Sequence, residues 1–326
     1  MENPIDDLTF IQEIATCRYG KVYLTSKQGS PNYFCTKIIN KNQTINNLHF
    51  RNELNNSILI LKDLNHPNII KFFELKETQD KFYIVTEYCN GGDLKEYINS
   101  YKQLYHKNLS EEIVQYIMCQ IVEGLKYIHN KKILNRGISL NNILINYENE
   151  KDKQNANIMK AQVKICNFNY ATYIPKGNKQ RKCIGIPLFM DPLMLRDPNN
   201  SEYDYKYDIW SLGIICYMLL SNESPFCSHD DFQELLDRTR EGKYNVPKIW
   251  SNEIVSFLNC TLQYKENKRI SCDILYNHEF LRKDIREFTK INLEDLKDIE
   301  ISGSNIVMKI DNNDAQNAYF ENEIEY

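Results

Sequence analysis

The first hundred residues carry a pattern typical of β-strands. Aromatic and β-branched residues fill positions 10–24 and 33–39, and two further runs of this kind occupy positions 69–75 and 82–88. Between the two pairs a helix is predicted, because apolar residues recur near the helical spacing at Leu48, Leu54, Ile58 and Leu61. This part of the chain therefore predicts a strand-rich unit with one helix.

The pattern becomes helical from Ser110 onward. Ser110 is a good N-cap, acidic residues follow it in the first turn, and apolar residues then line one face as far as Ile128. The polar stretch 147–157 predicts a loop between two short strands. Later helices are predicted at residues 207–220, 230–240, 251–262 and 271–276. A strand-rich part followed by a helical part predicts an α+β fold.

Composition places the chain among globular proteins and argues against several functional classes. Of its 326 residues, 42% are hydrophobic and 26% are charged, and the formal net charge is −4. This balance gives no general attraction to nucleic acid or to anionic membranes. The longest apolar run, residues 209–220, is too short to span a bilayer, and the first residues lack the pattern of a secretory signal.

The ten cysteines indicate a reducing environment. They are spread through the sequence without a Cys-x-x-Cys pair, and several lie inside apolar runs. Such cysteines are typical of the core of a cytoplasmic protein, and their spacing argues against a zinc site.

Six short motifs along the chain include residue types that are used in phosphate and metal binding. They occupy residues 14–22, 34–37, 135–142, 167–169, 185–193 and 208–213. In order and spacing they match the protein kinase signature set: the glycine-rich loop, the lysine strand, the catalytic loop, the metal-binding motif, the end of the activation segment and a central buried helix. The chain thus resembles eukaryotic protein kinases of the serine/threonine type. Residues 84–94, which include the hinge between the two lobes at 87–89, are similar to those of the Unc-51-like and calcium/calmodulin-dependent groups.

This resemblance implies a bilobal protein kinase fold. Residues 1–88 would form a small β-rich N-lobe with the helix called αC in the family, and residues 89–282 a larger, mainly helical C-lobe. Residues 283–326 would form an acidic tail, which has little apolar periodicity and is expected to be loosely ordered.

The residues that perform phosphoryl transfer in the family are replaced here. The resemblance places Gly137 where an aspartate accepts the substrate proton, and Ser139 where a lysine neutralises the phosphoryl group. Asn167 replaces the aspartate that binds magnesium, and Asn142 remains as a second, vestigial ligand. Two neutral amides bind a hard dication more weakly than carboxylates do. No catalytic residue is therefore intact, and a working Mg²⁺ site is not expected.

Positions that support the chemistry are altered as well. Ser57 stands where the αC glutamate of the family would pair with Lys37, and Glu53 lies one helical turn earlier. Leu193 replaces the glutamate that would pair with Arg269. The sequence therefore predicts that two structural ion pairs of the family are missing.

The nucleotide pocket implied by the resemblance is better preserved. Adenine is held by backbone hydrogen bonds and apolar contact, so this pocket can outlast the metal site. Lys37 has two interpretations, as a phosphate ligand or as a solvated strand residue. Weak, magnesium-independent ATP binding is therefore one hypothesis, and the absence of nucleotide binding is the other. The candidate nucleotide-binding residues are Ile14, Gly20, Val22, Cys35, Lys37, Thr86, Glu87, Cys89, Asn142, Leu144 and Cys166.

Basic residues gather in the activation segment. Lys176, Lys179, Arg181 and Lys182 lie within a few residues of one another. They form either a docking patch for an acidic partner or a solvated, mobile loop. In the family, a residue at the position of Arg136 grips a phosphate on this segment.

Three functional hypotheses follow. The first is a cytoplasmic pseudokinase that acts as a scaffold or allosteric partner of other proteins, an active kinase among them. The second is an atypical serine/threonine kinase that retains slow ATP-dependent transfer through Lys37, Asn142 and Asn167. The third is a different nucleotidyl transfer chemistry on the same fold.

Overall fold

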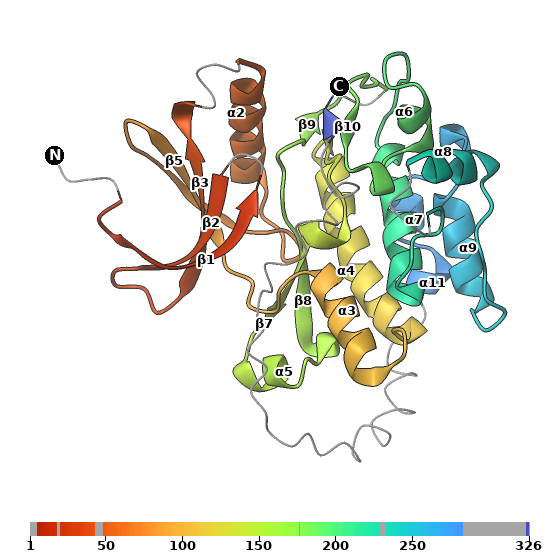
Figure 1. Ribbon diagram of the computed structural model, residues 1–326, viewed down its shortest axis with the longest axis horizontal. Coiled ribbons are helices and arrows are strands. Elements are labelled where there is room, and N and C mark those ends of the chain that lie inside the picture. Colours follow the sequence, from red (N-terminus) through yellow and green to blue (C-terminus); the bar gives the residue numbers. More distant parts are fainter. Residues whose placement is uncertain are drawn as a thin grey trace.

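A computed structural model describes residues 5–17, 20–42, 48–175, 177–227, 232–282 and 324–325. The N-terminal part contains a five-stranded antiparallel sheet that packs against a helix, and the C-terminal part is mainly helical (Figure 1). The predicted α+β protein kinase fold is therefore confirmed.

The N-terminal sheet has the strand order β1-β2-β3-β5-β4. Lys37 lies in the central strand β3, where its register partners are Val22 on β2 and Ile84 on β5. The predicted strand at 10–24 consists in fact of two antiparallel strands, β1 and β2. The strands are β1 (Leu8–Cys17), β2 (Gly20–Lys27), β3 (Tyr33–Asn40), β4 (Phe72–Glu77) and β5 (Lys81–Glu87).

Helix α2 (Leu48–Asp63) covers one face of this sheet. Its apolar side buries Phe50, Leu54 and Ile58 in a cluster with Ile39 and Ile84 of the sheet. Removing these side chains from water stabilises the contact by roughly 1.5–3 kcal/mol for each large residue. The predicted helix near residue 50 is therefore confirmed, and its packing fixes its position beside Lys37.

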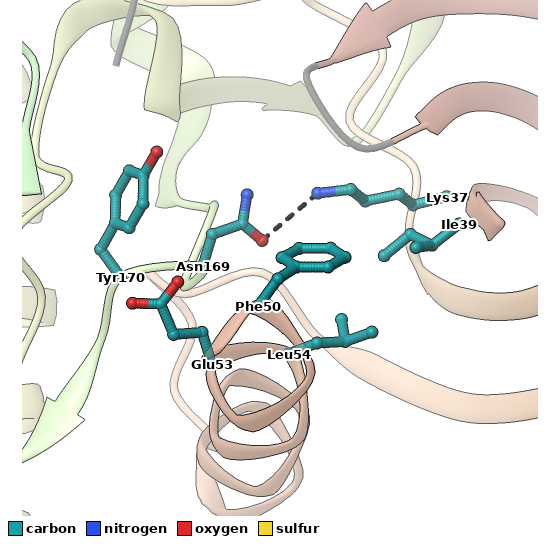
Figure 2. Close-up of a pocket in the computed structure, with 7 residues that line it drawn as sticks. All are labelled: Lys37, Ile39, Phe50, Glu53, Leu54, Asn169 and Tyr170. Carbon is teal, nitrogen blue, oxygen red and sulfur yellow. Dashed lines mark hydrogen bonds between the residues drawn. The ribbon is translucent and has the colours of Figure 1, made fainter. Parts of the chain in front are cut away.

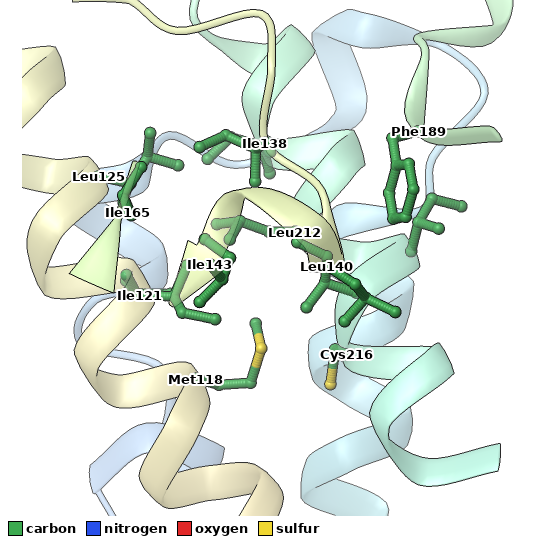
Figure 3. Close-up of a cluster of buried hydrophobic side chains, with 14 of the residues drawn as sticks. Met118, Ile121, Leu125, Ile138, Leu140, Ile143, Ile165, Phe189, Leu212 and Cys216 are labelled. Atoms are coloured by element: carbon green, nitrogen blue, oxygen red, sulfur yellow. The ribbon is translucent and has the colours of Figure 1, made fainter. Parts of the chain in front are cut away.

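Two helices form the centre of the C-terminal part. In α4 (Glu111–Asn130) the apolar stripe that ends at Ile128 is buried. In α7 (Lys206–Ser221) every residue from Tyr207 to Leu220 is buried, which explains why its sequence is apolar on all sides. Figure 3 shows side chains from both helices meeting those of the loop between them.

Further helices and short strands complete the C-terminal part. The other helices are α3 (Leu94–Tyr105), α5 (Glu150–Gln154), α6 (Pro192–Arg196), α8 (Phe232–Glu241), α9 (Asn252–Thr261), α10 (Cys272–Leu275) and α11 (Glu279–Arg282). Three strand pairs join segments of the loops: β6 (Ile133–Leu134) with β9 (Thr172–Tyr173), β7 (Ile143–Tyr147) with β8 (Ala161–Ile165), and β10 (Ile184–Gly185) with β11 (Ile324–Glu325).

Two local predictions need correction. The stretch 147–157 is not only a loop, because it contains the short helix α5, whose N-cap Asn149 accepts a hydrogen bond from the backbone of Asp152 at 2.9 Å. Helix α3 was not predicted from the sequence. It begins at the N-cap Asp93 and buries only Leu94 and Ile98, so its apolar stripe is narrow.

The predicted loosely ordered tail, residues 283–326, lies outside the described residues except for 324–325, which form β11. Within the described ranges, no helix has the length and apolar character needed to cross a membrane.

Candidate functional site

A buried carboxylate anchors residues 135–142, which match the catalytic loop of the family and are called the catalytic-type loop below. Asp208, at the start of α7, is completely buried and accepts hydrogen bonds from the backbone N–H groups of Asn135 (3.0 Å) and Arg136 (2.9 Å). A ring nitrogen of His129 lies 2.9 Å from the same carboxylate. These contacts hold Arg136 at a backbone φ of 62°, a conformation that most residues avoid. The start of this loop is therefore fixed by helix α7.

The next residues of the loop form a network of amides. The side-chain nitrogen of Asn142 donates to the carbonyl of Gly137 at 2.8 Å, and the side-chain nitrogen of Asn167 donates to Asn142 Oδ1 at 3.1 Å. The backbone N–H of Asn169 donates to Asn167 Oδ1 at 3.3 Å. The two side chains placed at the metal-binding positions are therefore bonded to each other and to the backbone.

This arrangement does not fit a magnesium ion. Mg²⁺ requires oxygen ligands and is usually bound through one or two carboxylates. Here both amide oxygens already accept hydrogen bonds, and no carboxylate takes part in the network. In the part of the chain that the structure describes, no group of three or more His, Cys, Asp or Glu side chains is placed to hold a metal.

Two polar atoms near the amide network are buried without a hydrogen-bond partner. These are Asn135 Nδ2 and Ser139 Oγ, both in fully buried residues. Buried polar atoms without a partner are uncommon and cost free energy. An added Cβ on Gly137 would meet Asn135 Oδ1 at 3.4 Å, which is an ordinary van der Waals contact, so a small side chain fits there. The loop therefore has unsatisfied polar groups where the family places its charged residues.

Lys37 contacts the altered metal motif directly. Its Nζ donates to Asn169 Oδ1 at 3.2 Å, a bond that joins strand β3 to the loop after β8 beside helix α2 (Figure 2). Ser57, at the αC glutamate position, is buried. Glu53, one turn earlier, forms an ion pair with Lys182 of the activation segment. The predicted replacement of the lysine–glutamate pair is thus accompanied by a lysine–asparagine hydrogen bond.

The space around Lys37 is small. The residues drawn in Figure 2 enclose a cavity of about 10 Å³, close to the volume that a single water molecule needs. This cavity is therefore too small for an organic ligand unless helix α2 or Asn169 moves.

Several candidate adenine-binding residues form a neutral wall. Burial raises the pKa of the Cys35 thiol to about 11, and burial also raises the pKa of Cys89 and Cys166. These thiols are therefore protonated at neutral pH. The hydroxyl of Thr86 donates to the carbonyl of Cys35 at 3.4 Å. Ile14, Val22 and Leu144 are half-buried.

Two other candidates have structural roles. An added Cβ on Gly20 would lie 1.8 Å from the carbonyl oxygen of Ile38, so the contact between β2 and β3 requires glycine there. The carboxylate of Glu87 pairs with Lys164 at 3.1 Å. The group of Glu87 that would bind adenine is therefore its backbone, as the resemblance implies for the hinge.

One acidic residue near this pocket was not proposed from the sequence. Asp93 forms a β-bridge with Leu144, and Asn141 Nδ2 donates to its carboxylate at 3.4 Å. Burial raises its pKa to about 6, although its contact with the backbone N–H of Glu96 opposes this shift. The sequence signal was its position directly after Gly91 and Gly92.

One prediction for the activation segment was wrong. Arg269 has a carboxylate partner after all, because Asp191 forms a fully buried ion pair with it. Arg136 donates to the Tyr170 carbonyl at 2.7 Å and to the Tyr203 hydroxyl at 3.1 Å. The Arg136 guanidinium is therefore bonded to a carbonyl and to a tyrosine hydroxyl.

The basic residues of the activation segment form ion pairs with three different parts of the chain. Lys179 pairs with Glu266 at 2.7 Å, Arg181 pairs with Glu202, and Lys182 pairs with Glu53. Lys176 lies outside the described residues.

Comparison with known proteins identifies the family. The model of the protein kinase domain family matches residues 8–281. The human serine/threonine-protein kinase ULK1 is 30% identical over 70% of this chain, and atg1 of Dictyostelium discoideum is 33% identical over 70%. ATG1a of Arabidopsis thaliana is 30% identical over 72%.

These matches cover only part of each relative. The aligned region is 21% of the human protein, 35% of the Arabidopsis protein and 32% of the Dictyostelium protein. All three are named as serine/threonine kinases, which agrees with the Unc-51-like resemblance of the hinge. With the five-stranded sheet, the anchored loop and the family match in place, the chain belongs to the protein kinase domain family.

Proposed function

We propose that this chain is a catalytically inactive protein kinase domain that acts by binding other proteins, as a scaffold or as an allosteric partner of an active kinase. The observation that carries this proposal is the amide network. Gly137, Ser139 and Asn167 bring no charge to the positions that need it, and Asn142 and Asn167 bond to each other.

Magnitudes support inactivity. Loss of a general base costs about 10²–10⁴-fold in rate, and loss of metal electrostatics costs several kcal/mol more, at about 1.36 kcal/mol per tenfold. These effects are not additive. Even so, a kinase that turns over at roughly 1–100 per second would become almost undetectable.

Weak nucleotide binding without magnesium forms the second part of the proposal. Its support is the neutral wall of Cys35, Cys89 and Cys166, together with the ammonium group of Lys37 at the edge of the site. A phosphate that reached Lys37 would have to displace Asn169 from it. We therefore expect adenine to contribute most of the affinity.

Incorporation of labelled phosphate from ATP into a generic protein substrate tests the proposal. The wild-type chain and its Lys37→Ala variant should give the same background. Incorporation that Lys37→Ala abolishes would establish a slow atypical kinase instead. Mass spectrometry of the substrate in the same assay separates nucleotidyl transfer, which would add a nucleotide mass rather than a phosphate.

A further inference from the structure

The end of the sequence forms a strand on the activation segment. Residues Ile324–Glu325 pair antiparallel with Ile184–Gly185, with Ile184 opposite Glu325 and Gly185 opposite Ile324. Figure 1 shows β11, the dark blue strand near the label of the C-terminus, beside β10. Residues more than 130 positions apart therefore share one two-stranded sheet.

Strand β10 is a fixed template for this pairing. The side chain of Ile184 is completely buried, and its carbonyl accepts a hydrogen bond from Tyr207 Oη at 2.8 Å. An added Cβ on Gly185 would lie 2.4 Å from the Tyr207 hydroxyl and 3.3 Å from the carbonyl of Arg136. The strand is thus pressed between helix α7 and the catalytic-type loop, and it presents a backbone edge in a defined position.

The charges of the two segments are complementary. Residues 321–326 read Glu-Asn-Glu-Ile-Glu-Tyr, with three carboxylates in six positions. The segment before β10 carries Lys179, Arg181 and Lys182. Each of these pairs with an acid elsewhere, but the Arg181 side chain is 76% exposed. An exposed pair contributes little, so its cation can be shared with another carboxylate at small cost.

The distance along the chain permits this contact. Between Arg282 and Ile324 lie residues 283–323, which are 41 residues, and at roughly 3.3 Å each such a chain can reach more than 100 Å. Two residue pairs contribute only a few hydrogen bonds, each worth about 0.5–1.5 kcal/mol. Attachment to the same chain compensates, because a tether raises the effective concentration of the segment to the millimolar range.

We propose that the edge of β10 is a docking site for an acidic extended segment, and that residues 321–326 of the same chain occupy it by strand addition. Backbone pairing supplies the affinity in this mode of recognition, and side chains supply the preference for sequence. Because β10 touches the carbonyl of Arg136, the docked segment lies beside the catalytic-type loop. A protein partner that needs this edge has to displace it first.

Hydrogen exchange of the full chain tests the proposal. In a variant with both Ile324→Pro and Glu325→Pro, residues 324–325 lose their N–H donors and are fixed at an unsuitable φ. Amides of the 183–186 region should then exchange at least about 10-fold faster, which corresponds to 1.4 kcal/mol. The matched control carries Asn312→Pro and Asn313→Pro and should exchange like the wild type. Equal exchange in all three proteins would overturn the proposal.

Dilution distinguishes the same chain from a second copy. Protection of the 183–186 region should not change between 1 and 50 µM protein, on the order of the range that exchange experiments use. Protection that falls on dilution would show that the segment comes from another molecule and would contradict the proposal.

A synthetic peptide tests the role of charge. A peptide with the sequence of residues 320–326, added at millimolar concentration to the double-proline variant, should restore protection at β10. The same peptide with its three glutamates replaced by glutamine should bind several-fold more weakly. Equal binding of the two peptides, or no protection by either, would refute the charge-assisted docking. None of these measurements depends on phosphoryl transfer, so they can fail or succeed independently of the proposed inactivity.

Discussion

The two halves of the catalytic-type loop differ in how their polar groups are satisfied. At its start, the backbone N–H groups of Asn135 and Arg136 bond to the buried carboxylate of Asp208. A few residues later, Gly137 and Asn142 bond only to neutral groups, and Ser139 Oγ has no partner. The first half keeps a charge that organises the backbone, and the second half has lost the charges that would face reactants.

In an active kinase the loop must both stabilise the fold and bring charges to the reactants. In this chain only the first of these two requirements is met. Asp208 and the Arg269–Asp191 pair stabilise the folded chain, because each satisfies groups that would otherwise be buried without a partner. Gly137, Ser139 and Asn167 are not needed for that purpose. Substitutions in the two regions should therefore affect stability very unequally.

The largest effect is expected at Asp208. Asp208→Ala leaves the buried N–H groups of Asn135 and Arg136 without acceptors. At about 1–3 kcal/mol per group, it should lower the free energy of unfolding by roughly 2–6 kcal/mol. Urea denaturation measures this loss. The matched variant Asn167→Ala loses two side-chain hydrogen bonds at a half-buried position, and should lower the free energy of unfolding by only about 1–2 kcal/mol. If Asn167→Ala lowered the free energy of unfolding more than Asp208→Ala, the two halves of the loop would have the opposite roles.

The buried ion pair should give a nearly equal loss with a distinctive coupling. Arg269→Met leaves the Asp191 carboxylate buried without its partner, and breaking such a pair costs about 3–5 kcal/mol. The double variant Asp191→Leu/Arg269→Met should be less destabilised than the sum of the single variants, because no unpaired charge remains. Strict additivity in this double-mutant cycle would show that the pair is unimportant.

A smaller, pH-dependent effect is expected at Asp93. Since its pKa is raised from 3.8 to about 6 in the folded state, the folded chain binds the proton more tightly than the unfolded chain. This residue therefore makes stability fall as the pH rises from 4 to 6, and the loss is complete above 6. Asp93→Asn keeps a capping side chain and should stabilise the protein at pH 7 by about 1–2 kcal/mol.

The free energy of unfolding, measured at pH 4 and at pH 7, tests whether the Asp93 carboxylate lowers stability as the pH rises. The stability difference between Asp93→Asn and the wild type should be present at pH 7 and nearly vanish at pH 4. A difference that grows toward low pH would mean that the carboxylate is stabilised, not destabilised, by its surroundings.

The smallest effect is expected at Gly137. Because an added Cβ would meet Asn135 Oδ1 at 3.4 Å, an ordinary van der Waals contact, Gly137→Ala should change stability by less than about 1 kcal/mol. Gly137→Asp places a carboxylate at this buried position and costs more. It should not restore phosphoryl transfer by itself. The triple variant Gly137→Asp/Asn167→Asp/Asn169→Gly, which also restores the family's glycine at position 169, is the stronger test. If it binds ATP and stays inactive, two other changes limit the chemistry as well: Ser57 at the αC glutamate position, and Ala15 and Cys17 at two glycine positions of the glycine-rich loop.

The sequence predicted the elements whose signal is local. Helix α7 is apolar on every side, and the apolar stripe of α4 follows an N-cap, so both could be found from single segments. Helix α5 was missed because its five polar residues bury no side chain.

The contacts that could not be predicted join distant segments. Asp191 and Arg269 are 78 positions apart, and no local pattern identifies Asp191 as the replacement for the acid missing at Leu193. The hydrogen bond between Asn142 and Asn167 spans 25 positions and depends on how two loops meet. Such contacts follow from packing, which fixes distances that sequence spacing leaves open.

The magnesium dependence of ATP binding tests the central claim most directly. The claim is that the amides of Asn142 and Asn167 have closed the metal site while the fold around them is intact. Thermal unfolding with millimolar ATP should show the same shift in EDTA as in magnesium. Two results would contradict the account: a thermal shift that appears only with magnesium, or a shift which shows that ATP binds at least about tenfold more tightly with magnesium than with EDTA, a difference of about 1.4 kcal/mol.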